Sequence, residues 1–285
     1  MRVIESCAEC LYNRQLRLTD DRAYLAEIRE IIDNRDKEAT APYLVYRFNQ
    51  TYRKHFGKTA SYATASYADV KKRYNGLVLS IEDALRERIE QSEDPLLTAF
   101  SYARAGNYID FGAIRNVDEK TFFSLLERDD FSAHDLQTFE SFTAECVTAK
   151  SLLLLADNCG EIVLDKLFLE QVGQRYPQIK LSVLVRGGEV LNDATVEDAL
   201  NAGIDSVAQI ISSGVAVSGT VYDMISDEAK NAIDSADVIL SKGQGNYEAL
   251  IGHGRHIFYS FLCKCERFTN RFQVPSLTGI FVEEM

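Results

Sequence analysis

The spacing of hydrophobic positions changes about halfway along the chain. Up to about residue 145, apolar residues recur three and four positions apart, as in Tyr24–Ile32 and Val70–Val78, and this spacing is typical of amphipathic helices. From about residue 150, short apolar runs alternate with helical segments. Alternation of this kind predicts a mainly parallel sheet with helices on both faces. We therefore expect a mostly helical N-terminal domain, residues 1–145, followed by a three-layer α/β/α sandwich, residues 146–285.

Five apolar runs are the candidate strands of that sheet. They are Ser151–Ala156, Leu181–Val185, Val207–Ile211, Val238–Leu240 and Ile257–Leu262, and the clearest helices between them are Ile162–Tyr176 and Met224–Ser235. Polar residues follow four of these runs directly. Because the carboxyl ends of parallel strands lie at one edge of a sheet, we expect those polar residues to meet there.

The first run stops at Asp157 and Asn158, and Asp193 lies beyond the second run. Carboxylate and amide oxygens suit a hard cation such as Mg²⁺ or Mn²⁺ and are poor ligands for zinc. The alternative is that Asp157 and Asp193 cap the helices that follow them. Spacing alone slightly favours the caps, and both interpretations stay open.

Lysines mark two further strand ends. Lys242 opens the glycine-rich segment Lys242–Glu248, whose N–H groups can hold a phosphate or simply form a turn into a short helix. It is not a P-loop, because the lysine precedes the glycines. Lys264 follows the fifth run, where burial would require a carboxylate or a ligand phosphate as partner. A solvent-exposed lysine on an edge strand is the alternative.

Charge and composition make nucleic acid and membranes unexpected as binding partners. The 285 residues include 43 acidic and 31 basic side chains, and this net charge of -12 makes a nucleic-acid surface unexpected. With neither a long apolar run nor the apolar core of a signal peptide, we expect a cytoplasmic protein that does not contact a membrane. The six cysteines should then be thiols. The C-x-x-C pair Cys7 and Cys10 fits half a metal site, a redox pair or two core thiols.

Several segments together resemble the signatures of the metal-dependent damage-control phosphatases, long catalogued as domain of unknown function 89. The segments are Asp157–Asp165, Val185–Gly187 with Leu191–Thr195, Ser241–Glu248, Ala105–Gly112 and the Lys264–Cys265 pair. Cys7 and Cys10, followed by Arg14 and Gln15, resemble the prokaryotic branch that carries a cysteine pair. The similarity spans nearly the whole chain.

The resemblance implies helices packed on an α/β/α sandwich and a divalent cation held by Asp157, Asn158 and Asp193. Mg²⁺ or Mn²⁺ is the expected ion, with Co²⁺ or Ni²⁺ as further candidates. Members of the family hydrolyse phosphate monoesters of small metabolites, including sugar phosphates. The sequence departs from the family at Cys159, where alanine is usual, and at Gly188-Glu189, where a small residue and proline are common. The loop around Gly188 is therefore expected to be more mobile.

The resemblance and the strand-end positions together give a predicted site. The predicted catalytic residues are Asp157, Asp193 and Glu161, and the predicted phosphate-binding residues are Gly160, Asn107, Asp110, Lys242, Asn246 and Lys264. Water, activated by the metal or by a carboxylate, is expected to attack phosphorus in line, and Glu161 and Asp110 are the two candidate bases. A covalent intermediate on Asp157 is disfavoured, because haloacid-dehalogenase-type phosphatases have a second aspartate where this chain has Cys159.

The leading hypothesis is a metal-dependent phosphatase acting on small phosphorylated metabolites. One alternative is a methyltransferase that uses S-adenosylmethionine, which the lack of a G-x-G pattern in the first turn disfavours. Another is a non-catalytic module that binds a phosphometabolite without needing the metal. The sequence does not determine the substrate, the native metal or the oligomeric state.

Overall fold

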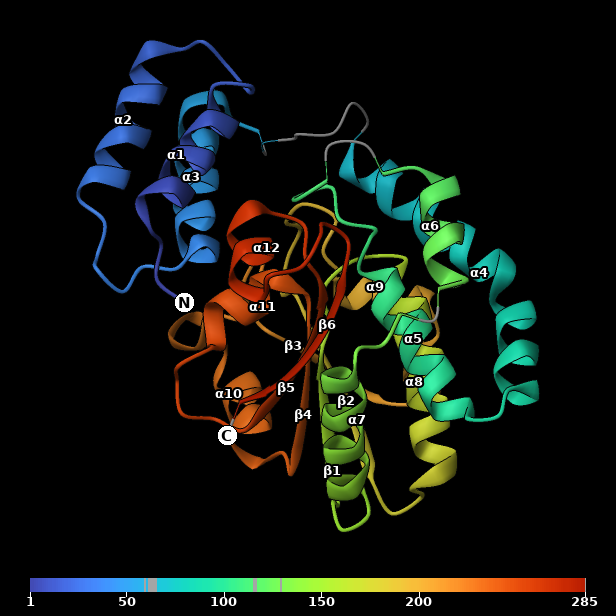
Figure 1. Ribbon diagram of the computed structural model, residues 1–285. Helices are drawn as coiled ribbons and strands as arrows, with labels where there is room; N and C mark the ends of the chain where they lie inside the picture. The colour runs from blue at the N-terminus through green and yellow to red at the C-terminus, as the bar shows by residue number, and fades with distance from the viewer. Residues whose placement is uncertain (59, 61–65, 115–116, 129, 285) are drawn as a thin grey trace.

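The computed structural model describes residues 1–58, 60, 66–114, 117–128 and 130–284. In the C-terminal half, a six-stranded sheet lies between two layers of helices (Figure 1). The strands are β1 (Ser151–Leu155), β2 (Lys180–Val185), β3 (Gln209–Ser212), β4 (Val238–Lys242), β5 (Ile257–Leu262) and β6 (Gly279–Glu284). The predicted α/β/α sandwich with a mainly parallel sheet is confirmed.

The strand order is β3-β2-β1-β4-β5-β6, and every neighbouring pair is parallel except β5 and β6. The chain runs outward from β1 through β2 to β3, then returns to the other side of β1 for β4 and β5. Leu152 of β1 accordingly pairs with Leu181 on one side and with Val238 on the other. Open α/β sheets bind ligands where the winding reverses in this way, which here is between the ends of β1 and β4.

All five predicted strands are present, with ends within two residues of the prediction. The sixth strand, β6, was missed, because it is half polar and ends at Glu283 and Glu284. It pairs along its whole length with β5 and forms the antiparallel edge of the sheet. Parallel strands buried on both faces give apolar runs that stand out in the sequence, whereas an edge strand with a polar end does not.

The two faces of the sheet pack into separate hydrophobic cores. The first core joins Leu152 and Leu154 to the helices α4 (Tyr67–Gln91), α5 (Pro95–Gly106), α6 (Glu119–Leu126), α7 (Ala133–Cys146), α8 (Glu161–Arg175) and α9 (Val196–Asn201). The second joins Leu153 and Leu155 to α10 (Asp227–Ser235), α11 (Gly243–Leu250) and α12 (Glu266–Phe272). The leucines of β1 thus alternate between two cores, which explains their unbroken run.

The N-terminal helices divide into two groups. Three of them, α1 (Glu5–Gln15), α2 (Arg22–Asp33) and α3 (Ala41–Phe56), have a hydrophobic cluster of their own, whereas α4 to α7 share the first core of the sheet. The α1–α3 group lies beside α11 and α12 (Figure 1). Arg267 of α12 donates a hydrogen bond of 2.7 Å to the carbonyl oxygen of Arg2. The sequence pattern had placed all these helices in one domain.

Local caps account for several helix starts. Asp21 accepts a hydrogen bond from the Tyr24 N–H, and Asp94 caps α5 with Pro95 in the first turn. The helix predicted from Met224 begins later, because Ser226 caps α10. Short 3₁₀ helices cover Ile204–Ser206 and Tyr222–Met224. Over the residues described, none of the helices has the length and apolarity needed to cross a membrane.

Candidate active site

A cavity of about 170 Å³ lies at the carboxyl edge of the sheet. Asp157 and Asn158 line it from the end of β1, Asp193 from the loop after β2, and Asp110 from the loop after α5. A single water molecule needs only about 10–15 Å³ on the same measure. The cavity therefore has room for a small ligand at the point where the winding of the sheet reverses.

The interpretation of Asp157 and Asp193 as helix caps is wrong. Gly160 is the N-cap residue of α8, and this helix has no side-chain cap. Thr195 caps α9, and its side chain and that of Asp198 form a reciprocal capping box. The two aspartates instead line the cavity.

Arg186 holds the two aspartates in place. Its Nε donates to Asp193 Oδ2 at 2.7 Å, and its Nη2 lies 3.4 Å from Asp157 Oδ1. Only 1% of Arg186 is exposed. Asn158 and Asp193 form an isolated backbone bridge, and Asn158 Nδ2 donates to Asp157 Oδ2 at 2.8 Å. The fold thus brings the three predicted metal ligands together.

The electrostatics of these carboxylates fit a cation site. Burial raises the pKa of Asp157 well above its ordinary value, and the charges of Asp193, Glu161 and Asp110 raise it further. Burial also raises the pKa of Asp193, although Arg186 opposes this. Neighbouring carboxylates repel one another when they are ionised, and a cation bound between them reduces that repulsion. The all-oxygen set of Asp157, Asn158 and Asp193 matches the chemistry of a hard divalent ion.

A fully buried ionic cluster of Lys242, Glu161 and Asp165 contacts the amides that bind Asp157. Lys242 Nζ donates to Glu161 Oε1 at 2.7 Å and to Asp165 Oδ1 at 2.6 Å. Glu161 also accepts hydrogen bonds from the side-chain amides of Asn107 and Asn158. Burial raises the pKa of Asp165 to about 7, against the opposing charge of Lys242. Lys242 and Glu161 lie behind the cavity wall and fix the amides that contact Asp157.

Lys264 is a buried lysine with a carboxylate partner, and the exposed alternative is wrong. Its side chain has no exposed surface, and Nζ donates to Asn107 O at 2.5 Å and to Asp110 Oδ2 at 2.7 Å. Burial would raise the pKa of Asp110, but Lys264 and the N–H of Ala113 hold it below its ordinary value. Asn107 in turn donates to Asp157 Oδ2 at 3.0 Å. Lys264 therefore orients groups that reach the cavity.

Two other predicted residues shape the turns around the cavity. The N–H of Gly160 donates to Asn75 Oδ1 at 2.6 Å, so a protein group already accepts from it. Asn246 donates to the carbonyl oxygens of Ala156 and Lys242 and thereby ties the end of β1 to the end of β4. Both residues set backbone geometry close to the metal-ligand candidates.

Helix α11 approaches Asp157 closely, a contact that the sequence pattern did not predict. Helix α11 begins at Gly243 directly after β4, and Gly243 has a φ of +80°. A Cβ atom at this position would overlap the Asp157 carboxylate. The sequence feature that could have predicted this contact is Gly243 itself, a glycine immediately after a strand, in the segment that was interpreted as a possible phosphate-binding turn. The pairing of Arg186 with both aspartates was also missed, because it joins different loops.

The thiols of Cys7, Cys10 and Cys265 line the same cavity. All three are free cysteines. Cys7 and Cys10 belong to α1, and Cys265 precedes α12. The C-x-x-C pair is therefore part of the cavity wall, and its chemical role stays open.

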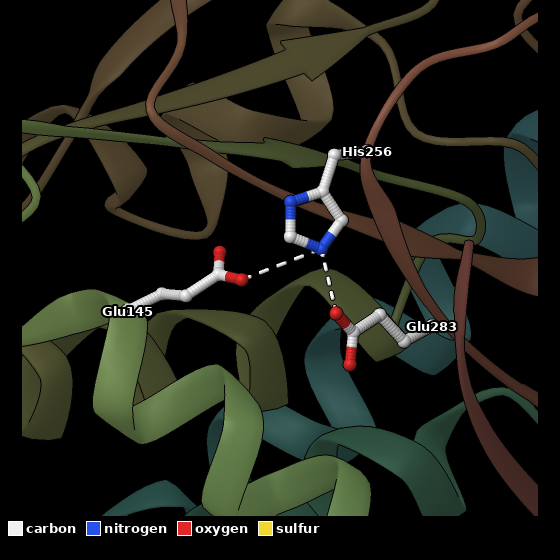
Figure 2. Close-up of side chains that lie close together, drawn as sticks. All are labelled: Glu145, His256 and Glu283. Atoms are coloured by element: carbon white, nitrogen blue, oxygen red, sulfur yellow. Dashed lines mark hydrogen bonds and ion pairs between the residues drawn. The ribbon is translucent and has the colours of Figure 1, made fainter. Parts of the chain in front are cut away.

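A different group with the spacing of metal ligands lies at the opposite edge of the sheet. The ligand atoms of Glu145, His256 and Glu283 are all within 4.8 Å of one another. Figure 2 shows the two carboxylates turned toward the His256 ring. His256 Nε2 is 2.8 Å from Glu283 Oε1 and 3.3 Å from Glu145 Oε1. A hydrogen bond between His256 Nε2 and Glu283 accounts for the closer of the two contacts. Because His256 directly precedes β5, the group is separate from the cavity.

The chain is similar to known proteins in both sequence and structure. Residues 2–277 match the model of the damage-control phosphatase ARMT1-like domain. A damage-control phosphatase of Archaeoglobus fulgidus is 28% identical over 278 residues, which cover 93% of each chain. An uncharacterized protein of Methanocaldococcus jannaschii is 32% identical over 218 residues, covering 70% of this chain and 67% of that one. The crystal structure of a DUF89 family protein from Pyrococcus horikoshii superposes with a TM-score of 0.79 at 24% identity over 100% of both chains, which supports the fold.

Proposed function

The chain belongs to the damage-control phosphatase ARMT1-like family, and from this premise we propose that it is a metal-dependent phosphatase of small phosphorylated metabolites, with sugar phosphates as candidate substrates. The observation that carries the proposal is the convergence of Asp157, Asn158 and Asp193 on one cavity. Hard-cation ligands beside a space of ligand size suit phosphoryl transfer. They do not suit the methyltransferase alternative, which the family match leaves without support.

In this proposal Asp157, Asn158 and Asp193 hold a divalent cation, Mg²⁺ or Mn²⁺, with Co²⁺ or Ni²⁺ as ions to test. When bound, the cation supplies positive charge that stabilises the phosphoryl oxygens in the transition state. Arg186 keeps both aspartates oriented through its contacts with Asp193 Oδ2 and Asp157 Oδ1. Its charge also offsets their repulsion, so the ligand set is ordered before substrate arrives.

Hydrolysis forms a bond between a water oxygen and phosphorus and breaks the P–O bond to the organic group. The water proton passes to a base, and the oxygen of the leaving group takes up a proton to become the alcohol. Of the two predicted bases, Asp110 lines the cavity, whereas Glu161 has no exposed surface and is held by Lys242. Asp110 is therefore the predicted base that water in the cavity can reach, and Lys264 both orients it and lowers its pKa, which makes it a weak base. Glu161 and Lys242 become positioning residues that act through Asn107 and Asn158. Phosphate binding by Lys264 stays a prediction.

Phosphate release by wild-type protein tests the proposal. We expect protein stripped with EDTA to lose at least about 10³-fold in rate with p-nitrophenyl phosphate and sugar phosphates, because several kcal/mol of charge stabilisation disappear. Adding back Mn²⁺, Mg²⁺, Co²⁺ or Ni²⁺ should restore the rate. Turnover that survives EDTA would contradict the proposal. Binding of a sugar phosphate that EDTA does not weaken, with no turnover under any metal, would favour the non-catalytic module instead.

A further inference from the structure

One face of helix α1 forms part of the wall of the cavity that the aspartates also line. Cys7, Cys10, Leu11 and Arg14 all line the cavity, and their spacing of three, four and seven residues places them on the same helix face. The first part of α3 adds the apolar residues Ala41, Pro42 and Val45. The α1–α3 group therefore closes the cavity over the sheet edge, and Arg14 contributes a cation to this wall.

Four other basic side chains near the cavity, in the part of the chain that the structure describes, are paired with carboxylates. These pairs are Arg186 with Asp193, Lys264 with Asp110, Lys242 with Glu161 and Asp165, and Arg267 with Glu248. Arg14, in contrast, has neither a hydrogen bond nor an ion pair from its side chain to any residue that the structure describes. Arg14 is half-buried and lines the cavity, where its charge acts on Asp110 and Glu248 without a direct ion pair to either.

An arginine in this position favours an anionic ligand. The guanidinium is planar, permanently charged and able to donate two parallel hydrogen bonds to a carboxylate or a phosphate. Two carboxylates that line the same cavity, Asp110 and Glu248, have Lys264 and Arg267 as ion-pair partners, and the more distant charge of Arg14 also acts to lower the pKa of both. The chain as a whole carries a charge of -12, so an anionic ligand needs a local cation to bind. Arg14 provides one at a position distinct from Lys264.

We propose that Arg14 forms a second anion-binding subsite, so that the preferred substrates are phosphate monoesters whose organic part carries another anionic group, a carboxylate or a second phosphate. This inference rests on the proposed function and specifies the class of substrate that the phosphatase would prefer. The reacting phosphate lies at the aspartate end of the cavity, the organic part packs against Leu11 and Val45, and the second anion pairs with Arg14.

Two pairs of substrates, matched except for the second anion, test the subsite. Glycerol 3-phosphate and 3-phosphoglycerate differ by one carboxylate, and fructose 6-phosphate and fructose 1,6-bisphosphate differ by one phosphate. In the wild type we expect kcat/KM to favour the second member of at least one pair by tenfold or more. The pair with the larger ratio identifies which anion the subsite takes. In Arg14→Gln that ratio should fall toward one through a rise in KM, and Arg14→Lys should keep part of it.

Arg17→Gln is the matched control, because Arg17 is an exposed arginine that follows the same helix and does not line the cavity. It should keep the wild-type ratio. A ratio near one for both pairs in the wild type, or one that Arg14→Gln leaves unchanged, would overturn the subsite. If the wild type hydrolyses none of the four compounds, calorimetric affinities for the same pairs decide the question of the subsite, while p-nitrophenyl phosphate tests the phosphatase proposal separately. Equal affinities in wild type and Arg14→Gln would then overturn the subsite.

Discussion

Replacing Gly243 with alanine should reduce metal-dependent phosphate release by about 10²-fold or more, the usual consequence of displacing a catalytic group by about 1 Å. The new Cβ would overlap the Asp157 carboxylate and lie 2.9 Å from Asp157 Cβ. Asp157 would have to turn away from Asn107 and Asn158, which now donate to its Oδ2. The site would lose a ligand although no residue of the proposed set has been changed.

Gly252→Ala provides the control for this substitution. Gly252 has a φ of +87°, close to that of Gly243, and a Cβ there meets nothing within 4 Å. Both variants therefore carry the backbone cost of alanine at positive φ, about 1–2 kcal/mol, but only Gly243→Ala adds the clash. Thermal unfolding and phosphate release should be measured on both. Equal rates in the two variants would show that Asp157 tolerates the displacement or is not needed.

Replacing Lys242 with methionine should lower the free energy of unfolding by about 3–5 kcal/mol. The substitution removes the cation of a fully buried cluster and leaves Glu161 and Asp165 without their counter-charge. Urea unfolding at neutral pH measures the loss. Lys150→Met is the control, because Lys150 is exposed and its substitution should stay within about 0.5 kcal/mol. A loss below 1 kcal/mol for Lys242→Met would contradict this account of the cluster.

The same variant should show a characteristic pH dependence. Asp165 has a folded-state pKa of about 7, above its ordinary value of 3.8, so its ionisation costs stability as the pH rises between those values. Without Lys242 the folded-state pKa rises further, because the cation that opposed the effect of burial is gone. The deficit of Lys242→Met should therefore be smaller at pH 5 than at pH 8. A deficit that does not change with pH would show that Asp165 is not left uncompensated.

The sequence predicted much of the sheet, because its signal is local. The leucines of β1 pack alternately into two cores, so the strand is apolar throughout and ends visibly at Asp157. The convergence of Asp157 and Asp193 followed from the common edge of parallel strands. The sequence also contained evidence against Asp193 as a helix cap. Thr195 and Asp198 have the spacing of a capping box, so α9 does not need Asp193 as its cap.

Other features depend on tertiary contacts that spacing does not encode. Lys242 is a buried ion-pair partner rather than a residue in the cavity wall, because the fold places it against Glu161 and Asp165 of α8. Arg14 reaches the cavity only because the α1–α3 group packs over the sheet edge. The helical periodicity of α1 is visible in the sequence, but the surface that this helix faces is not.

The central claim is that Asp157, Asn158 and Asp193 hold one divalent cation that the reaction requires. The most direct measurement is a calorimetric titration of metal-free protein with Mn²⁺, run in parallel on wild type, Asp157→Asn and the exposed control Asp20→Asn. We predict one Mn²⁺ per chain in the wild type and in Asp20→Asn, and binding weakened at least 100-fold in Asp157→Asn, together with loss of phosphate release. Undiminished Mn²⁺ binding by Asp157→Asn would contradict the account.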